Sequence, residues 1–221
     1  MKKKIILSIL AFGLVALSFG QDNVSIAIKV ADAQSENYEN LKNFSWKRSV
    51  TMFHNGEQKY KRMLQLRYNS KGEIESVVLG EESNVQKQKG PMRGKKQQGA
   101  IEQDTELINK SLTMVFGYIY MSKGQLVDLY DKNTVEDKGQ SYVVNATDVL
   151  EKGDNVIYTL DKETLLFESV ELTSSVDGQA LKSTMKFGNQ SDGANHPSVS
   201  ELEIPGRGIV VNTESFDFIK Q

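Results

Sequence analysis

The two histidines are the first side chains to consider for chemistry, because imidazole titrates near neutral pH and binds metals. His54 directly precedes the turn pair Asn55-Gly56, and His196 lies in the segment SDGANHP, close to Asp192. A metal site needs further ligands nearby, and neither flank of either histidine supplies them. We therefore expect His54 at an exposed hairpin tip and His196 in a loop that precedes a strand.

Carboxylates are numerous in the middle of the chain, where they could serve general acid/base chemistry. They are Glu81, Glu82, Glu102, Asp104 and Glu106. Acids at the start of a helix are also favoured by the helix dipole, so their number alone does not indicate catalysis. A hydrolase would require Asp104 and Glu106 to converge with His196 in a cleft.

Sequence motifs for catalysis are missing from the chain. It has no cysteine, no G-x-S-x-G or H-E-x-x-H segment, no phosphate-binding loop and no dinucleotide fingerprint. The sequence therefore predicts a protein that is not an enzyme and that uses no metal and no cofactor. It also has no disulfide, so hydrophobic burial and the hydrogen-bonded sheet must hold the fold together.

A basic segment over residues 83–99 interrupts the pattern of alternating strands. Its sequence, SNVQKQKGPMRGKKQQG, contains no acid, and its cations are Lys87, Lys89, Arg93, Lys95 and Lys96. We expect this segment to be a loop. It either stays solvated or binds a partner, which would be an acidic envelope protein or an anionic membrane surface.

The first twenty residues have the three parts of an export signal. Three lysines at positions 2–4 precede an apolar run over residues 5–17, and Ser18-Phe19-Gly20 offers small residues for cleavage. The apolar run is shorter than the roughly 20 residues that cross a bilayer, which favours a cleaved signal over a membrane anchor. We expect a periplasmic or secreted protein whose residues 21–221 form one domain that does not span the membrane.

The charge of the mature chain argues against one class of partner. Removing the three signal lysines from 27 basic residues leaves 24 against 29 acidic residues, a net charge of about −5. Proteins that bind nucleic acids normally carry an excess of Lys and Arg, so DNA and RNA are not expected partners.

The elements that must position these side chains are mostly strands. Hydrophobic periodicity predicts helices over 24–41, 100–120 and 125–132, and strands over 44–52, 60–68, 73–79, 141–147, 155–160, 165–173, 180–187, 199–204 and 209–218. Asn55-Gly56 predicts a type I′ hairpin between the first two strands. The fold class is therefore mainly β (α+β), a strongly curved antiparallel sheet or half-barrel of nine strands with a helical lid on its concave face.

This order of elements resembles the LolA-like superfamily of periplasmic lipoprotein carriers. The resemblance spans most of the mature chain and includes the phrase YTLDKETLLFESVEL, in which an Asp-x-x-Thr turn precedes an alternating strand. It implies a hydrophobic cavity, covered by helices, that accepts acyl chains. The carriers have an Arg-Pro pair that latches the lid. Arg67 is the nearest equivalent here, but Tyr68 follows it where the carriers have proline.

The resemblance and the aromatic and methionine content together suggest a binding cavity between the helix over 100–120 and the early strands. Its expected lining is Trp46, Val50, Met52, Leu64, Leu66, Leu112, Val115, Phe116 and Ile119. The expected partner is a lipid or a lipidated polypeptide. The same residues could fill an ordinary core, in which case the chain would be an envelope protein-protein interaction module.

Overall fold

The structure is a computed structural model of the 221-residue chain, and it describes residues 26–84, 91–189 and 194–221, with side chains of the second range from residue 101 onward. The expected signal over residues 1–20 lies outside the described residues. So do Lys87 and Lys89 of the basic segment. The cations Arg93, Lys95 and Lys96 fall within a helix, and their side chains are also outside the described part.

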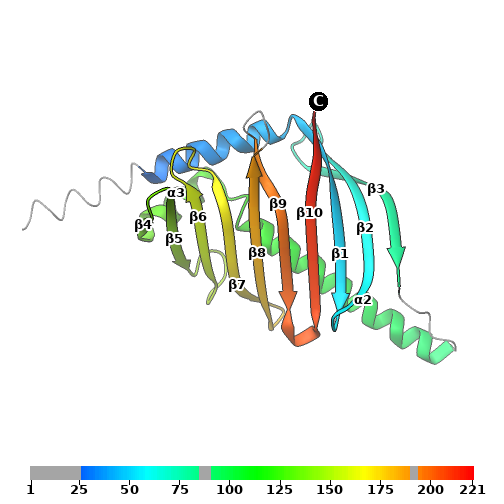
Figure 1. The fold of residues 1–221 in the computed structure, drawn as a ribbon. Helices are drawn as coiled ribbons and strands as arrows, with labels where there is room; N and C mark the ends of the chain where they lie inside the picture. The colour runs from blue at the N-terminus through cyan, green and yellow to red at the C-terminus, as the bar shows by residue number, and fades with distance from the viewer. Residues whose placement is uncertain (1–25, 85–90, 190–193) are drawn as a thin grey trace, which may run out of the picture.

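Ten antiparallel strands form one sheet (Figure 1). Their bounds are β1 Phe44–His54, β2 Glu57–Tyr68, β3 Ile74–Ser83, β4 Val135–Asp137, β5 Ser141–Thr147, β6 Asn155–Asp161, β7 Phe167–Val176, β8 Gln179–Asn189, β9 Asn195–Ile204 and β10 Ile209–Lys220. The order across the sheet is β3-β2-β1-β10-β9-β8-β7-β6-β5-β4. The first strand therefore pairs with the last, which joins two meanders into one sheet. The sequence predicted nine strands, and the three-residue β4 is the one it missed.

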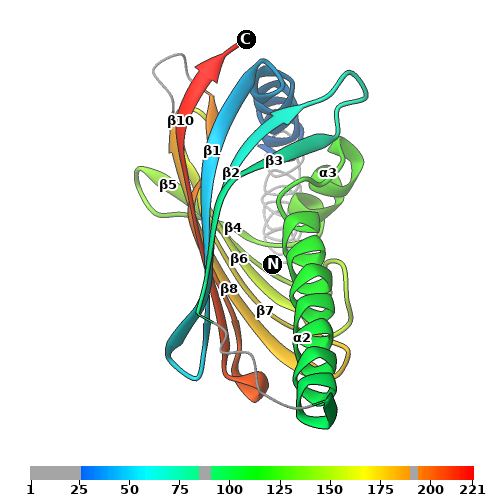
Figure 2. The same cartoon turned by 90° about the vertical axis from the view of Figure 1, so that its right-hand side faces the viewer.

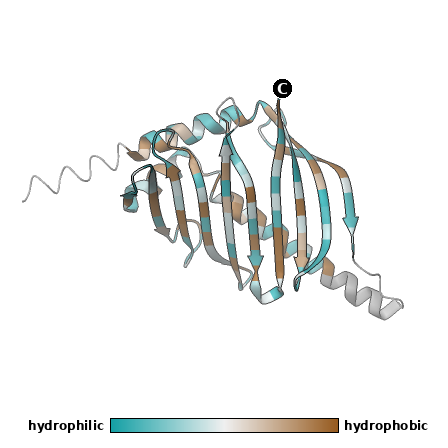
Figure 3. Cartoon of the chain, in the orientation of Figure 1, coloured by the Kyte–Doolittle hydropathy of each residue, from teal (hydrophilic) through white to brown (hydrophobic). Residues whose placement is uncertain are grey.

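The strands follow from alternation and from turn residues. Asn55 and Gly56 both have positive φ, 51° and 80°, as a type I′ turn requires, so the predicted hairpin is confirmed. Apolar and polar residues alternate along most strands (Figure 3). One face of the sheet is therefore buried, and its fully buried side chains include Val144, Val156, Tyr158, Leu160, Val170, Leu181, Met185, Leu202 and Ile204.

Three helices lie on the same face of the sheet (Figure 2). They are the N-terminal helix over residues 26–41, α2 Pro91–Gly117 and α3 Lys123–Lys132. The prediction of a loop through residue 99 was wrong, because α2 begins at Pro91. Proline is favoured at a first helical position, and the Arg, Lys and Gln residues that follow are good helix formers. In the described part of the chain, no helix combines the length and the apolarity that crossing a bilayer requires.

The buried residues fall into two clusters. The main cluster lies between α2, α3, the N-terminal helix and strands β5–β10. The second cluster lies where the N-terminal helix ends over β1 and β2. Its members are Leu41, Phe44, Trp46, Leu66, Tyr68 and Ala194, with Tyr38, Leu64 and Phe218 packed against them.

Helix α3 begins with a capping box, and this predicts the effect of a substitution. The Ser122 hydroxyl accepts from the backbone N–H of Gln125, and the Gln125 side chain accepts from the backbone N–H of Ser122 at 2.9 Å. Ser122→Ala removes the first of these bonds, so we expect the free energy of unfolding to fall by about 1 kcal/mol in urea titration. Ser122→Thr keeps the acceptor and serves as the control. Equal stability of the two variants would contradict the role of the cap.

Candidate functional site

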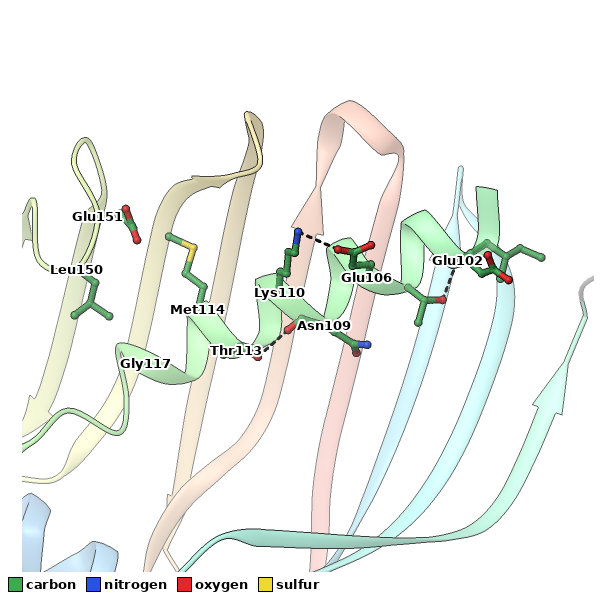
Figure 4. Close-up of a pocket in the computed structure, with 11 residues that line it drawn as sticks. Glu102, Glu106, Asn109, Lys110, Thr113, Met114, Gly117, Leu150 and Glu151 are labelled. Carbon is green, nitrogen blue, oxygen red and sulfur yellow. Dashed lines mark hydrogen bonds and ion pairs between the residues drawn. The ribbon is translucent and has the colours of Figure 1, made fainter. Parts of the chain in front are cut away.

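A long groove runs along one side of α2 (Figure 4). It encloses about 810 Å³, and its lining is Ile101, Glu102, Thr105, Glu106, Asn109, Lys110, Thr113, Met114, Gly117, Leu150 and Glu151. Lys110 lies 3.1 Å from Glu106 and 2.8 Å from Asp177, so ion pairs occupy its middle. We call this space the α2 groove.

A deeper space lies beneath the connection between α2 and α3, and we call it the elbow cavity. It encloses about 360 Å³ between the N-terminal helix, residues 119–126 and strands β7–β9. Its apolar and aromatic lining is Tyr38, Leu41, Ile119, Tyr120, Met121, Leu126, Phe167, Phe187 and Pro197, and its polar lining is Gln34, Ser35, Asn37, Ser122, Lys123, Gln125 and Asn195.

Polar contacts hold the N-terminal helix over the elbow cavity. The Asn37 side chain donates to the carbonyl oxygen of Asn195 at 2.8 Å and accepts from its backbone N–H at 2.7 Å. Lys123 forms an ion pair with Asp32 across the gap between α3 and the N-terminal helix. Exposed ion pairs of this kind contribute little stability, so the two hydrogen bonds between Asn37 and Asn195 contribute more to holding the N-terminal helix in place.

A third space, of about 10 Å³, adjoins the elbow cavity, and we call it the Arg48 pocket. Its lining is Leu41, Trp46, Arg48, Tyr68, Tyr120, His196, Pro197 and Phe218. Leu41, Tyr120 and Pro197 line both spaces, so the pocket and the cavity lie on either side of the same three residues.

Arg48 is the charged group of this pocket. Its Nε donates to the Ser215 hydroxyl at 3.0 Å, and its guanidinium lies 5.7 Å from the centre of the Phe116 ring, a distance at which cations and rings attract. Burial lowers the pKa of Arg48 from its usual value. Burial also raises the pKa of Tyr68 and Tyr120, so both remain neutral phenols.

His196 faces the same pocket, and here the sequence-based prediction was wrong. The residue lies in β9, not in a loop, and it is only 5% exposed. Its ring centre is 3.8 Å from that of Phe218. Burial lowers the pKa of His196 to about 4, helped by the positive charge of Arg48 and opposed by a hydrogen bond with the backbone of Ala194.

The structure distributes the nine predicted lining residues over several places. Trp46, Leu64 and Leu66 belong to the second cluster, and Val50, Met52, Leu112, Val115, Phe116 and Ile119 belong to or pack against the main one. Of the nine, Ile119 lines the elbow cavity and Trp46 lines the Arg48 pocket, and none lines the α2 groove. The structure therefore does not bring the predicted set together around one hollow.

The other predicted residues also lie apart. Arg67 on β2 pairs with Glu75 of the neighbouring β3 at 3.3 Å and is largely exposed, and its role as a latch stays a prediction. Asp104 pairs with Arg207 at 2.5 Å, Glu106 pairs with Lys110, and neither lines the Arg48 pocket with His196. The structure therefore does not bring these residues together in the cleft that a hydrolase would require.

Arg48 was not among the site residues predicted from the sequence, although the chain contains a signal for it. Arg48 stands between Trp46 and Val50 on the alternating apolar face of the first strand. A charged residue at such a position is expected to have a special environment, because charges are costly to bury.

Comparisons with known proteins bear on the fold. No protein-family model and no curated protein sequence matches the chain. Among solved structures, it is similar to a domain described as an outer membrane lipoprotein-sorting protein from Vibrio parahaemolyticus, with 12% identity, a TM-score of 0.48, and coverage of 88% of this chain and 92% of that one. It is also similar to a DUF1329 family protein from Desulfovibrio piger, with 10% identity, a TM-score of 0.43, and coverage of 90% and 93%. A LolA superfamily protein from Nitrosomonas europaea matches with 10% identity, a TM-score of 0.39, and coverage of 86% and 93%.

Proposed function

We propose that the protein is an exported, non-enzymatic carrier that binds a lipid or a lipidated polypeptide, with an acyl chain in the elbow cavity. The observation that supports this most is the cavity itself. Its volume of about 360 Å³ and its mixture of apolar walls with a few polar groups are typical of small-ligand sites.

The size of the cavity sets the energy that a ligand could gain. A space of this volume holds about ten groups the size of a water molecule, and so about ten methylenes. Burying them would contribute about 8 kcal/mol before the cost of ordering the chain. That is enough for binding and still permits release. The export signal expected over residues 1–20 supports a location of this activity in the periplasm or outside the cell.

A fluorescent fatty acid, 11-(dansylamino)undecanoic acid, provides a direct binding test. Ser35 lines the elbow cavity and Thr113 lines the α2 groove, and both are exposed. We expect Ser35→Phe to weaken binding at least about tenfold, because the new ring takes the space of two or three methylenes. Thr113→Phe adds the same ring to the groove and should leave the affinity within about twofold of wild type.

Two results of this test would count against the assignment. Absence of probe binding to the wild-type protein would exclude the carrier function. A loss confined to Thr113→Phe would move the acyl chain from the elbow cavity to the α2 groove. Native mass spectrometry of protein purified from its own periplasm provides an independent check, because a carrier should retain acyl ligands.

An interaction module is the second candidate, and the edge strand β3 favours it. This strand pairs only with β2, and four of its apolar side chains are exposed: Ile74 at 41%, Val77 at 63%, Val78 at 49% and Leu79 at 53%. Exposed edges of this kind can pair with a strand of another protein. In that case Val77→Lys should abolish complex formation with the partner and leave probe binding unchanged.

A further inference from the structure

The charge of Arg48 has no counter-ion among the residues that the structure describes. A guanidinium carries five N–H donors, and the structure pairs only its Nε, with the neutral Ser215 hydroxyl. In the described ranges, no carboxylate forms an ion pair with Arg48, and its two terminal nitrogens have no hydrogen-bond acceptor. Arginine keeps its charge even when buried, so the pocket contains a cation that lacks an anion.

One more polar group of the same pocket has no partner among the described residues. Trp46 is 4% exposed, yet its Nε1 makes no hydrogen bond to any residue that the structure describes. Buried polar groups are normally paired, and an indole N–H can only donate. A cation and an unpaired donor around one space are the groups that bind an anion.

The size of the pocket restricts which anion can enter. A volume of about 10 Å³ has room for about one water-sized atom, such as a single carboxylate oxygen. A whole carboxylate has two oxygens and a phosphate or sulfate head group has four around its central atom, so the carboxylate is the anion that needs the least extra space here. Leu41, Tyr120 and Pro197 line both spaces, so the pocket lies directly beside the elbow cavity, where a hydrocarbon chain would lie.

We propose that Arg48 and Trp46, with His196 beside them, form the head-group site for an unesterified long-chain carboxylate whose hydrocarbon chain lies in the elbow cavity. This rests on the proposed carrier function and narrows its ligand to a fatty-acid type. The carboxylate would accept from the terminal nitrogens of Arg48, which form charge-assisted hydrogen bonds, and from Trp46 Nε1.

The chain has one tryptophan, so its fluorescence reports on this pocket directly. We would titrate the protein at pH 8 with dodecanoate and with dodecanol, which has the same chain and no charge, and follow Trp46. We expect the wild-type protein to bind dodecanoate at least about tenfold more tightly than dodecanol, because hydrogen bonds to charged groups are strong.

Substitutions separate the head-group site from the chain site. Arg48→Met should lower the dodecanoate affinity to that of dodecanol and leave the dodecanol affinity within about twofold. Arg62→Met is the matched control, since Arg62 lies on the neighbouring strand β2 but pairs with Glu81 at 2.8 Å and lines none of the three spaces. It should keep the preference for the acid.

Each outcome decides between the two proposals. Equal binding of acid and alcohol by the wild-type protein would overturn the head-group site and leave the carrier function intact. Failure of both ligands to bind would overturn both. An undiminished acid preference in Arg48→Met would show that another group binds the carboxylate. If Arg48→Met does not fold, Arg48→Lys and the wild-type comparison still decide, because lysine keeps the charge but lacks the planar fork.

Discussion

Asp154→Ala is expected to lower the free energy of unfolding by about 3 to 5 kcal/mol, the largest effect of any single substitution considered for this chain. The Asp154 side chain is 2% exposed and accepts the Tyr118 hydroxyl at 2.5 Å. It also accepts the backbone N–H groups of Val149, Leu150 and Glu151 at 2.8, 3.0 and 3.0 Å. Alanine would leave the buried Tyr118 hydroxyl and three partly buried backbone N–H groups without their acceptor. Urea unfolding followed by circular dichroism measures the change.

The pKa of Asp154 agrees with this role. Burial alone would raise it, but the Tyr118 hydroxyl and the three backbone donors outweigh burial and lower the pKa below its usual 3.8. The unfolded chain therefore takes up this proton at a higher pH than the folded one. Asp154 contributes its full stability above pH 3.8, and that contribution is lost as the pH falls through the lower, folded value.

Two variants serve as controls for Asp154. Tyr118→Phe removes one of the four bonds and should cost about 1 to 2 kcal/mol. Asp148→Asn changes an exposed carboxylate in the same loop, at a φ of 54° that asparagine tolerates, and should stay within about 0.5 kcal/mol of wild type. If Asp148→Asn proves as damaging as Asp154→Ala, the loss comes from the loop as a whole.

Elements with a strong repeating pattern could be predicted from the sequence, and elements without one could not. The Asn55-Gly56 hairpin and the alternating strands β5 to β8 follow directly from turn chemistry and period-two alternation. Residues 91–99 contain almost no apolar residue, so hydrophobic periodicity does not indicate the first turns of α2. The helix propensity of the Arg, Lys and Gln residues in this segment does indicate a helix. The strand β4 has three residues, too few for any alternation to show.

Strand β9 shows a second reason for failure. Pro197 follows His196, and proline lowers the expectation of a strand because it cannot donate to the ladder. The structure accommodates it at a register shift between Lys186 and Phe187 of the neighbouring β8, where Pro197 lies opposite Phe187. The strand therefore begins at Asn195, and His196 enters the buried face instead of a loop.

The candidate site was the least predictable part, because its members come from distant segments. The Arg48 pocket combines the end of the N-terminal helix, the strands β1, β2, β9 and β10 and the segment after α2. Strand alternation could place Arg48 on the apolar face, but only the tertiary structure shows that no carboxylate of the described ranges forms an ion pair with it there. The predicted cavity residues were chosen by hydropathy, and hydropathy does not distinguish the wall of a cavity from a filled core.

Lowering the pH from 7 to 4 is expected to destabilise the protein by about 3 kcal/mol through His196 alone. The unfolded histidine takes up its proton near pH 6.5, and the folded one does so near pH 4, because burial and the charge of Arg48 disfavour the imidazolium. Between these values the unfolded state binds more protons. The stability from neutral His196 is therefore complete above pH 6.5 and is lost progressively as the pH falls to 4.

The comparison of two histidine variants isolates this effect from the titration of carboxylates. His196→Gln does not titrate, so its stability should fall less steeply than that of the wild type, by about 1 kcal/mol for each pH unit between 6 and 4.5. His54→Gln removes the other histidine, which lies at the β1–β2 hairpin, and should retain the wild-type slope. Urea titrations at several pH values give the free energy of unfolding as a function of pH. If this free energy falls in parallel for wild type and His196→Gln, the buried imidazole does not control the loss of stability in acid. Because the charge of Arg48 disfavours the imidazolium, Arg48→Met should also make the free energy of unfolding depend less steeply on pH. That result would link the loss of stability in acid to the charge in the pocket.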